Sequence, residues 1–201
     1  MRKFVGFGLA LVTGLVSTAA LAQEASTSVE VSSGGNQLGL GADLGVLIPV
    51  GNLSDASSVM IGGVIKGEYP VTPGVEVTGR IGYFHGLSKE PTPGASASLS
   101  DIPIWVGARY FFGGARDGVY AGGEIGLNIL KTTIEMPTIQ TPLGPVGGEL
   151  SDSSTEFGLN LIAGYKLGDI DFRGNLHFLD IGDPGDSMAV GLTVGYTFAK
   201  F

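Results

Sequence analysis

The sequence predicts an all-β fold: an eight-stranded antiparallel up-and-down transmembrane β-barrel, preceded by a cleavable signal peptide. The clearest observation is a strict alternation of apolar and small residues from 188 to 198. This period of two is typical of a strand with one apolar face. The pattern recurs seven times upstream, and about ten residues suffice for a tilted strand to cross a bilayer. The apolar positions of the closing strand are Met188, Val190, Leu192, Val194, Tyr196 and Phe198.

The N-terminal sequence predicts that the protein is exported. A basic pair at 2–3 precedes an apolar stretch at 4–16, and a small-residue box at 20–22 predicts cleavage between Ala22 and Gln23. A membrane-anchoring helix is the alternative, but the apolar stretch is short for a span. The chain has no cysteine, so we expect neither a lipid anchor after cleavage nor a disulfide.

We expect three parts in the chain: the signal peptide at 1–22, a flexible periplasmic lead at 23–36 and the barrel at 37–201. The lead is short and polar, which is typical of disorder. Without the signal peptide, nine Lys and Arg stand against 19 Asp and Glu, a net charge of −10. Such a chain would repel nucleic acid, so we expect no nucleic-acid partner.

The first four predicted strands each carry one face of aliphatic and small residues without a charge. Gly or Pro lies in every connection that follows them, as turns require. After the second strand the connection is a short turn at 70–74, whereas the connection after the third is long. The four ranges are 38–48, 59–69, 75–83 and 102–110.

The last four predicted strands repeat the pattern, and only Gly168 and Asp169 separate the second from the third of them. Their ranges are 119–129, 157–167, 170–178 and 188–198. Short turns thus alternate with longer connections at 49–57, 86–101, 131–155 and 180–187, the asymmetry of transmembrane barrels. Aromatic residues gather at strand ends in two predicted girdles: Tyr69, Tyr110, Phe112, Tyr165, Phe172, Tyr196 and Phe198 on one side, and Tyr83, Phe157 and Phe178 on the other.

The opposite faces of the strands hold nearly all of the strand charges. A soluble barrel that buries its apolar face would show the same alternation. The membrane arrangement is favoured because the polar face is crowded with Gly, its acids and bases balance as buried ion pairs must, and the mean hydropathy is +0.32. We therefore predict an ionic network in the lumen made of Asp43, Lys66, Glu68, Glu76, Arg80, Arg109, Glu124, Lys166, Asp171 and Arg173.

Four parts of the sequence carry a family resemblance. They are the signal peptide, I-P-V-G-N-L-S-D at 48–55, D-I-P-I-W-V-G-A-R-Y-F-F at 101–112 and G-Y-T-F-A-K-F at 195–201. The chain resembles the small eight-stranded outer-membrane barrels, meaning the OmpA transmembrane domain, OmpX and the porin-family outer-membrane β-barrel proteins. The resemblance implies the outer membrane of a diderm (Gram-negative) bacterium and insertion by the barrel-assembly machinery. It also implies contact with outer-membrane lipids and lipopolysaccharide, and a monomeric state.

The resemblance further implies a C-terminal insertion signal, here Gly195, Tyr196, Phe198 and Phe201. In the family the terminal Phe shares the face of the preceding aromatic residues. Counted by parity, Phe201 falls on the face opposite Tyr196 and Phe198. We therefore expect the signal to end at Phe198, with a tail of three residues after it.

Three functions fit such a barrel. An eight-stranded lumen is just wide enough to be filled by side chains, so the charges predict a structural plug, with a narrow passive pore for small solutes as the alternative. A lipid A-modifying hydrolase is a remote alternative, since it needs a Ser-His-acid group. The chain offers only His85 and His177, with Ser88 and Asp180 nearby in sequence. We expect no enzyme activity, no catalytic residues and no cofactor.

The outer connections carry two further candidates. Asp180, Asp183 and Asp186 supply oxygens that suit a divalent cation, but a solvated turn is the favoured interpretation because no ligand set is complete, and we predict no metal. The 131–155 segment carries apolar residues among three prolines. It either extends the hairpin of its flanking strands, covers the barrel mouth or contacts a partner. We predict a membrane-structural or surface-interaction role that these loops mediate.

Overall fold

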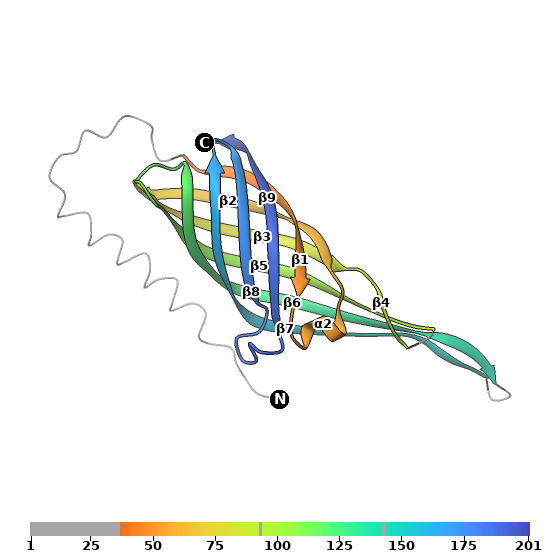
Figure 1. The fold of residues 1–201 in the computed structure, drawn as a ribbon. Helices are drawn as coiled ribbons and strands as arrows, with labels where there is room; N and C mark the ends of the chain where they lie inside the picture. The colour runs from red at the N-terminus through yellow and green to blue at the C-terminus, as the bar shows by residue number, and fades with distance from the viewer. Residues whose placement is uncertain (1–36, 93, 142–143) are drawn as a thin grey trace, which may run out of the picture. The chain divides into compact units, whose positions relative to one another are not determined.

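The structure is a computed structural model that describes residues 37–92, 94–141 and 144–201. The predicted signal peptide, its Ala22–Gln23 cleavage site and the predicted lead lie outside these residues. One antiparallel sheet holds all the described strands (Figure 1). In chain order the elements are β1 (Gly39–Pro49), α2 (Leu53–Ala56), β2 (Met60–Thr72), β3 (Val75–Gly86), β4 (Lys89–Thr92), β5 (Ala95–Phe111), β6 (Gly118–Thr141), β7 (Gly144–Leu167), β8 (Ile170–Phe178) and β9 (Met188–Lys200).

The sheet closes on itself through two pairings between strands that do not follow each other directly in the chain. β1 pairs with β9, and β3 pairs with β5. Every other neighbour in the ring is also next in the chain, apart from the short β4, which pairs with β5 alone. The result is the predicted up-and-down barrel of eight strands, with β4 as an added ninth strand outside the ring.

The apolar face of the strands points outward. In β9, for example, Leu192 is 63% exposed while the neighbouring Thr193 is only 5% exposed. The predicted girdle residues lie on this outer face, and all except Phe178 are largely exposed. A soluble barrel would bury these side chains, so the membrane arrangement is the right one. No helix in the described part of the chain is long and apolar enough to cross a membrane.

Glycine on the inner face lets the charged side chains fit. A Cβ added at Gly195 would lie 2.0 Å from Asp43 Oδ1 and 2.8 Å from Lys66 Nζ. A Cβ at Gly41 would lie 2.8 Å from the Lys66 side chain and 2.5 Å from a carbonyl oxygen of β9. The crowding of Gly on the polar face therefore has a steric cause, because any larger residue would displace the ion pairs.

The predicted loop at 86–101 was wrong, because most of its residues are strand, and most of 131–155 is strand as well. Segment 86–101 forms β4 and the start of β5, and segment 131–155 continues β6 and β7 as one long hairpin. β6 and β7 have 24 residues each, whereas about ten cross the membrane. Of the three alternatives for 131–155, the structure shows the extended hairpin, which runs on past the barrel rim (Figure 1).

The predicted tail after Phe198 was also wrong. The pairing of β1 with β9 shifts register between Leu40 and Gly41, which is a β-bulge that adds one residue to β9. Beyond the bulge, Phe201 exchanges both backbone hydrogen bonds with Leu38, at 2.9 and 3.0 Å. Leu38 belongs to the lipid-facing row, so the bulge returns Phe201, 71% exposed, to the face of Tyr196. Counting alternate residues along the sequence cannot reveal a β-bulge, because the bulge inserts one extra residue into the strand.

Two leucines of β7, one within the membrane and one beyond it, allow a test of the membrane assignment. Leu161→Arg, on the lipid-facing row, should lower the free energy of unfolding in lipid vesicles by about 2–4 kcal/mol. Leu150→Arg, on the part of β7 beyond the rim, should change it by less than about 0.5 kcal/mol. Denaturant titration followed by Trp105 fluorescence measures both. Equal losses for the two variants would contradict the assignment.

Candidate functional site

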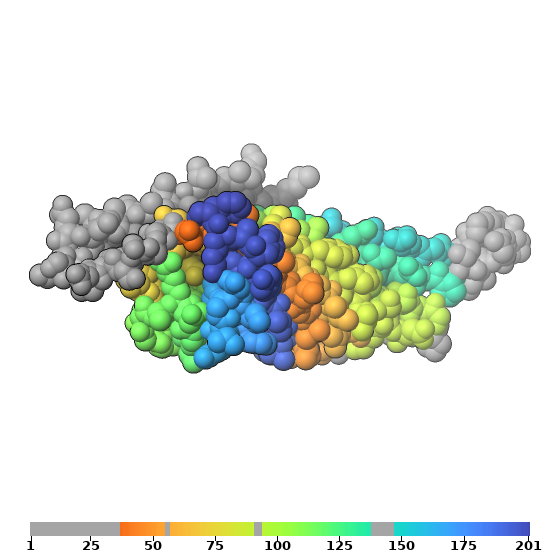
Figure 2. Space-filling view, turned by 90° about the horizontal axis from the view of Figure 1, so that it is seen from above, coloured from red at the N-terminus to blue at the C-terminus, as the bar shows by residue number. Residues whose placement is uncertain are grey.

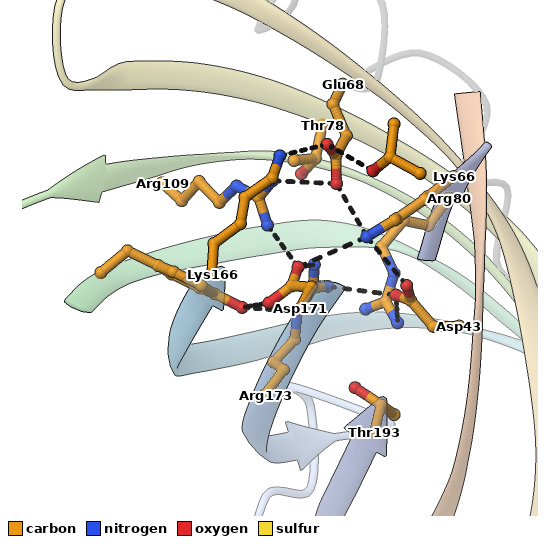
Figure 3. A network of polar contacts seen from close by, with 12 residues as sticks. Asp43, Lys66, Glu68, Thr78, Arg80, Arg109, Lys166, Asp171, Arg173 and Thr193 are labelled. Carbon is orange, nitrogen blue, oxygen red and sulfur yellow. Dashed lines mark hydrogen bonds and ion pairs between the residues drawn. The ribbon is translucent and has the colours of Figure 1, made fainter. Parts of the chain in front are cut away.

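The ten predicted lumen charges meet inside the barrel. They come from seven strands, β1, β2, β3, β5, β6, β7 and β8, and every one of them is buried. Salt bridges join all ten into one continuous network. Figure 3 shows part of it, around Lys66, Arg109 and Asp171. The five acids and five bases cancel, so the network itself carries no net charge.

Arg109 is a centre of this network. Its Nη1 lies 2.6 Å from Asp171 Oδ2, and its Nε and Nη2 donate to Glu76 Oε1 at 2.9 and 2.5 Å. The guanidinium also lies 4.9 Å from the ring centroid of Tyr120 and 5.2 Å from that of Phe111. These cation–π contacts and ion pairs hold the planar group on all sides.

Glu124 is a second centre, contributed by β6. Its carboxylate accepts from Arg80 at 3.0 Å, from Arg173 at 3.4 Å, from Asn160 at 2.7 Å and from Thr78 at 3.2 Å. Four donors from three different strands, β3, β7 and β8, thus converge on one carboxylate. A buried carboxylate is tolerated in a protein interior only when it is paired in this way.

Two lysines connect the centres. Lys66 Nζ lies 3.0 Å from Asp43, 2.8 Å from Glu68 and 3.4 Å from Asp171. Lys166 Nζ, from the opposite side of the barrel, lies 2.6 Å from Glu68. The contacts therefore cross the lumen rather than run along one strand.

A layer of neutral polar and aromatic groups follows the network toward the outer rim. Trp105 Nε1 donates to Asn128 Oδ1 at 3.1 Å, and the His177 ring packs edge-on against the Trp105 ring at 5.2 Å. A cavity of about 10 Å³ lies beside them, lined by Val64, Arg80, Phe84, Pro103, Trp105, His177 and Thr193. That volume admits about one water molecule.

An apolar cluster fills the outer end of the lumen, and sequence reasoning missed it. It joins barrel residues to Leu53 of α2 and to Leu179 after β8. One signal in the sequence could have revealed the cluster. At the outer ends of the strands, apolar residues take the alternate positions that carry polar residues elsewhere. The cluster comprises Leu47, Leu53, Met60, Val64, Phe84, Leu99, Leu179 and Ala189, with Leu130 packed against it.

The two histidines lie in different environments. His85 is exposed on the outer face, where its Nδ1 lies 2.9 Å from Ser100 Oγ rather than near Ser88. His177 is buried in the lumen and does not pair with Asp180. Within the described residues neither imidazole has a hydrogen bond to a carboxylate, so the geometry supplies no Ser-His-acid group.

The Asp180–Asp186 connection is held by hydrogen bonds of its own. Asp180 accepts from the Gly182 amide at 2.7 Å, and Asp186 accepts from Asn52 of the neighbouring connection. Repulsion from Asp186 raises the pKa of Asp183 above its ordinary value. Across the described part of the chain, no group of three His, Cys, Asp or Glu is placed to hold a metal ion.

The outward face changes character where β5, β6 and β7 leave the membrane. Ile102 lies opposite Ile129, and in the next outward row Ser100 lies opposite Lys131. Beyond this row the outward positions of β5 and β7 are mostly Ser. We call this part of the sheet, residues 95–100, 131–141 and 144–154 with β4, the extension. It projects from the barrel as a narrow blade, with β4 and β5 beside β6 and β7 (Figure 2).

Comparison with known families agrees with this architecture. The sequence model of the outer membrane protein beta-barrel domain matches residues 8–198. The chain belongs to this family. It is therefore an integral β-barrel protein of the Gram-negative outer membrane. No curated protein matches this outer-membrane barrel in sequence.

Solved structures show the same fold at low sequence identity. Ail, the attachment invasion locus protein of Yersinia pestis, has a TM-score of 0.50 and 14% identity, with 81% of this chain and 97% of Ail covered. A second Ail structure, with the same values, holds the heparin analogue sucrose octasulfate. Neisserial surface protein A has a TM-score of 0.46 and 14% identity, with 80% of this chain and 97% of that chain covered.

The network predicts a large difference between buried and exposed ion pairs. Glu124→Ala removes one of the acids that Arg80 and Arg173 share and leaves the buried network with one uncompensated positive charge, so it should cost about 3–5 kcal/mol of unfolding free energy. Asp169→Ala removes the exposed pair with Lys200, whose atoms are 2.6 Å apart, and should cost less than about 1 kcal/mol. The single tryptophan, Trp105, reports unfolding of both variants. A loss below 1 kcal/mol for Glu124→Ala would contradict the network's role.

Proposed function

We propose that this outer-membrane barrel has a structural and surface-interaction role, in which a closed barrel holds the extension above the membrane. The observation that carries the proposal is the extension itself. Two strands of 24 residues far exceed the membrane thickness, and their outer halves remain paired in register almost to the hairpin end. A rigid, paired surface outside the membrane is suited to binding, because little chain entropy is lost on contact.

The filled interior supports the closed-barrel part of the proposal. From the inner to the outer end, the lumen holds the ionic network, the Trp105 layer and the apolar cluster. The cavity beside Trp105, at about 10 Å³, is too small for a hydrated ion. We propose that the ten charges act as a structural plug rather than as a selectivity filter.

If side chains fill the lumen as proposed, the protein should not conduct ions. Purified protein in planar bilayers should show no steady conductance, because three layers of side chains block the lumen. A general porin inserted under the same conditions serves as the positive control. Stable, voltage-independent channels from the unmutated protein would favour the narrow passive pore instead.

We also propose that the protein is not an enzyme. His85 lies 2.9 Å from Ser100 on the lipid-facing side, and this is the contact that most nearly resembles a hydrolytic site. Without an acid to orient the imidazole, such a pair is a poor general base. His85→Gln should therefore leave the lipid A mass spectrum of the cells unchanged. A lipid A species that disappears with this variant would overturn the assignment.

The chemistry of the outer surface distinguishes this barrel from Ail. Ail binds a polysulfated sugar in its crystal structure. Here the four outer segments, 49–57, 86–101, 131–155 and 180–187, hold nine carboxylates, of which Asp101 is buried in the barrel, and only two lysines. Polyanions would be repelled from such a surface. We propose that lipid and lipopolysaccharide surround the barrel and that a protein partner contacts the extension.

For biogenesis, we propose that Gly195, Tyr196, Phe198 and Phe201 form the signal for the barrel-assembly machinery, and that the mature protein is a monomer. The β-bulge supports this proposal, because it brings Phe201 into line with the lipid-facing row of Leu38 and Leu40. The signal would then extend to the terminal residue.

Deletion of the extension tests the surface role. Leu130 and Ser154 lie directly opposite each other, so residues 131–153 can be replaced by a short Gly-Ser turn. The variant should keep the gel-mobility shift on boiling that marks a folded barrel, because the lumen residues stay in place. It should lose binding of intact cells to their surface partner. Unchanged cell binding would refute a role for the extension.

A further inference from the structure

The side of the extension that continues the lumen face carries an unpartnered apolar row. Ala97, Ile134 and Leu150 lie directly opposite one another on β5, β6 and β7, so their side chains share one face. Ile134 is 41% exposed and Leu150 is 62% exposed. These residues lie beyond the rim, where water rather than lipid surrounds them. Exposed apolar rows of this kind on a water-facing sheet mark contact surfaces.

The row ends at an open sheet edge. In the described chain, β8 pairs with β7 only from Leu159 onward. The outer part of β7, residues 147–156, has β6 on one side and no strand on the other. Such an edge presents unpaired backbone groups that can accept another strand. An added strand would extend the apolar row from Leu150.

The charged residues on the outer part of β7 itself are all acidic, and the nearest base on β6, Lys131, lies opposite Ser153. Glu149 lies directly opposite Glu135 on one face, where like charges repel. Asp152 lies on the other face, opposite Thr132 and one row inward from Leu150. All three carboxylates are exposed and have no cationic partner among the described residues. A cation at this edge would therefore relieve the repulsion.

We propose that the outer edge of β7 binds a cationic β-strand of a partner protein, by strand addition beside residues 148–153. This inference rests on the proposed surface role and names the partner's chemistry. The partner strand places an apolar side chain opposite Leu150, and basic side chains opposite Asp152 and Glu149. Because Leu150 and Asp152 share one face and Glu149 lies on the other, the partner carries basic residues on both faces.

This geometry disfavours two other occupants. A polyanion meets only carboxylates along the edge. A second copy of β7 would bring its own Glu149 and Asp152 to the same edge, which adds like charges instead of compensating them. The acids therefore select against self-association, which an open edge strand otherwise invites.

Peptide titration of the full barrel in nanodiscs tests the proposal. The probe is a capped peptide, Thr-Thr-Thr-Lys-Thr-Val-Lys-Thr-Thr, whose central residues match positions 153 to 149 in antiparallel register. Backbone amide NMR shifts should concentrate in residues 147–156 and give the Kd. A peptide with Glu in place of both Lys should bind at least about tenfold more weakly, and added salt should weaken the Lys peptide.

Matched variants locate the charge effect. Glu149→Gln with Asp152→Asn should weaken the Lys peptide by about fivefold or more. Asp183→Asn with Asp186→Asn removes the same charge from another outer connection and should change the Kd by less than about twofold. Leu150→Thr, which keeps a strand-forming residue but removes the apolar contact, should also weaken binding. All variants should show the wild-type gel-mobility shift on boiling.

Several results would overturn the inference. The inference fails if the Lys peptide shifts no amide resonance of β7, or if the Glu peptide binds with the same Kd. It also fails if the two charge variants lose the same affinity for the Lys peptide. Amide shifts in β7 that depend on protein concentration without peptide would indicate a dimer instead. The deletion of residues 131–153 separates this failure from failure of the surface role. If deletion abolishes cell binding but the Lys peptide does not bind, the surface role stands and the partner class is wrong. If the peptide binds and deletion leaves cell binding unchanged, the edge chemistry stands and the surface role fails.

Discussion

Closure of the sheet is the constraint on which the rest of this structure depends. A strand in hydrocarbon has no water to satisfy its amide and carbonyl groups, so every edge within the membrane must find a partner. The pairings of β1 with β9 and of β3 with β5 remove the edges. With eight strands in the ring, the lumen is only wide enough for side chains. Glycine at positions such as 41 and 195 is then a steric necessity, because an added Cβ would collide with the inner ion pairs.

The narrow lumen also decides how charge is used. Ten ionised groups without bulk water are stable only as a compensated network, and here each centre draws donors from several strands. Arg109 and Glu124 thus connect strands that are not neighbours in the sheet. Such contacts oppose sliding of one strand past another, since a register shift would separate opposite charges. The apolar cluster fills the outer end of the lumen by hydrophobic packing, and Leu53 of α2 is part of it.

Outside the membrane the same strands meet different conditions. Water satisfies an open edge, so β7 can remain unpaired beyond the rim where it could not within the bilayer. Ser and Lys replace aliphatic residues on the outward face at the level of Ser100 and Lys131. One hairpin therefore serves two purposes: its inner half is a wall of the barrel, and its outer half is a rigid surface with an open edge. The filled lumen and the exposed extension both support the proposed surface role.

The sequence by itself determined the barrel and the identity of the ten inner charges, because a period of two assigns each residue of a regular strand to one face. The glycines and balanced charges of the polar face, with the positive mean hydropathy, indicated which face points to lipid. The sequence did not determine where the strands end, since residues 86–101 and 131–155 pair beyond the membrane although prolines and polar residues had suggested loops. It also misplaced Phe201, because a β-bulge near Phe198 shifts the face of every later residue and leaves no trace in the alternation. Which acid meets which base, and how Leu53, Phe84 and Leu179 come together at the mouth, only the tertiary structure decided. Those contacts join strands distant in sequence, and their geometry is set by the closure and tilt of the whole ring.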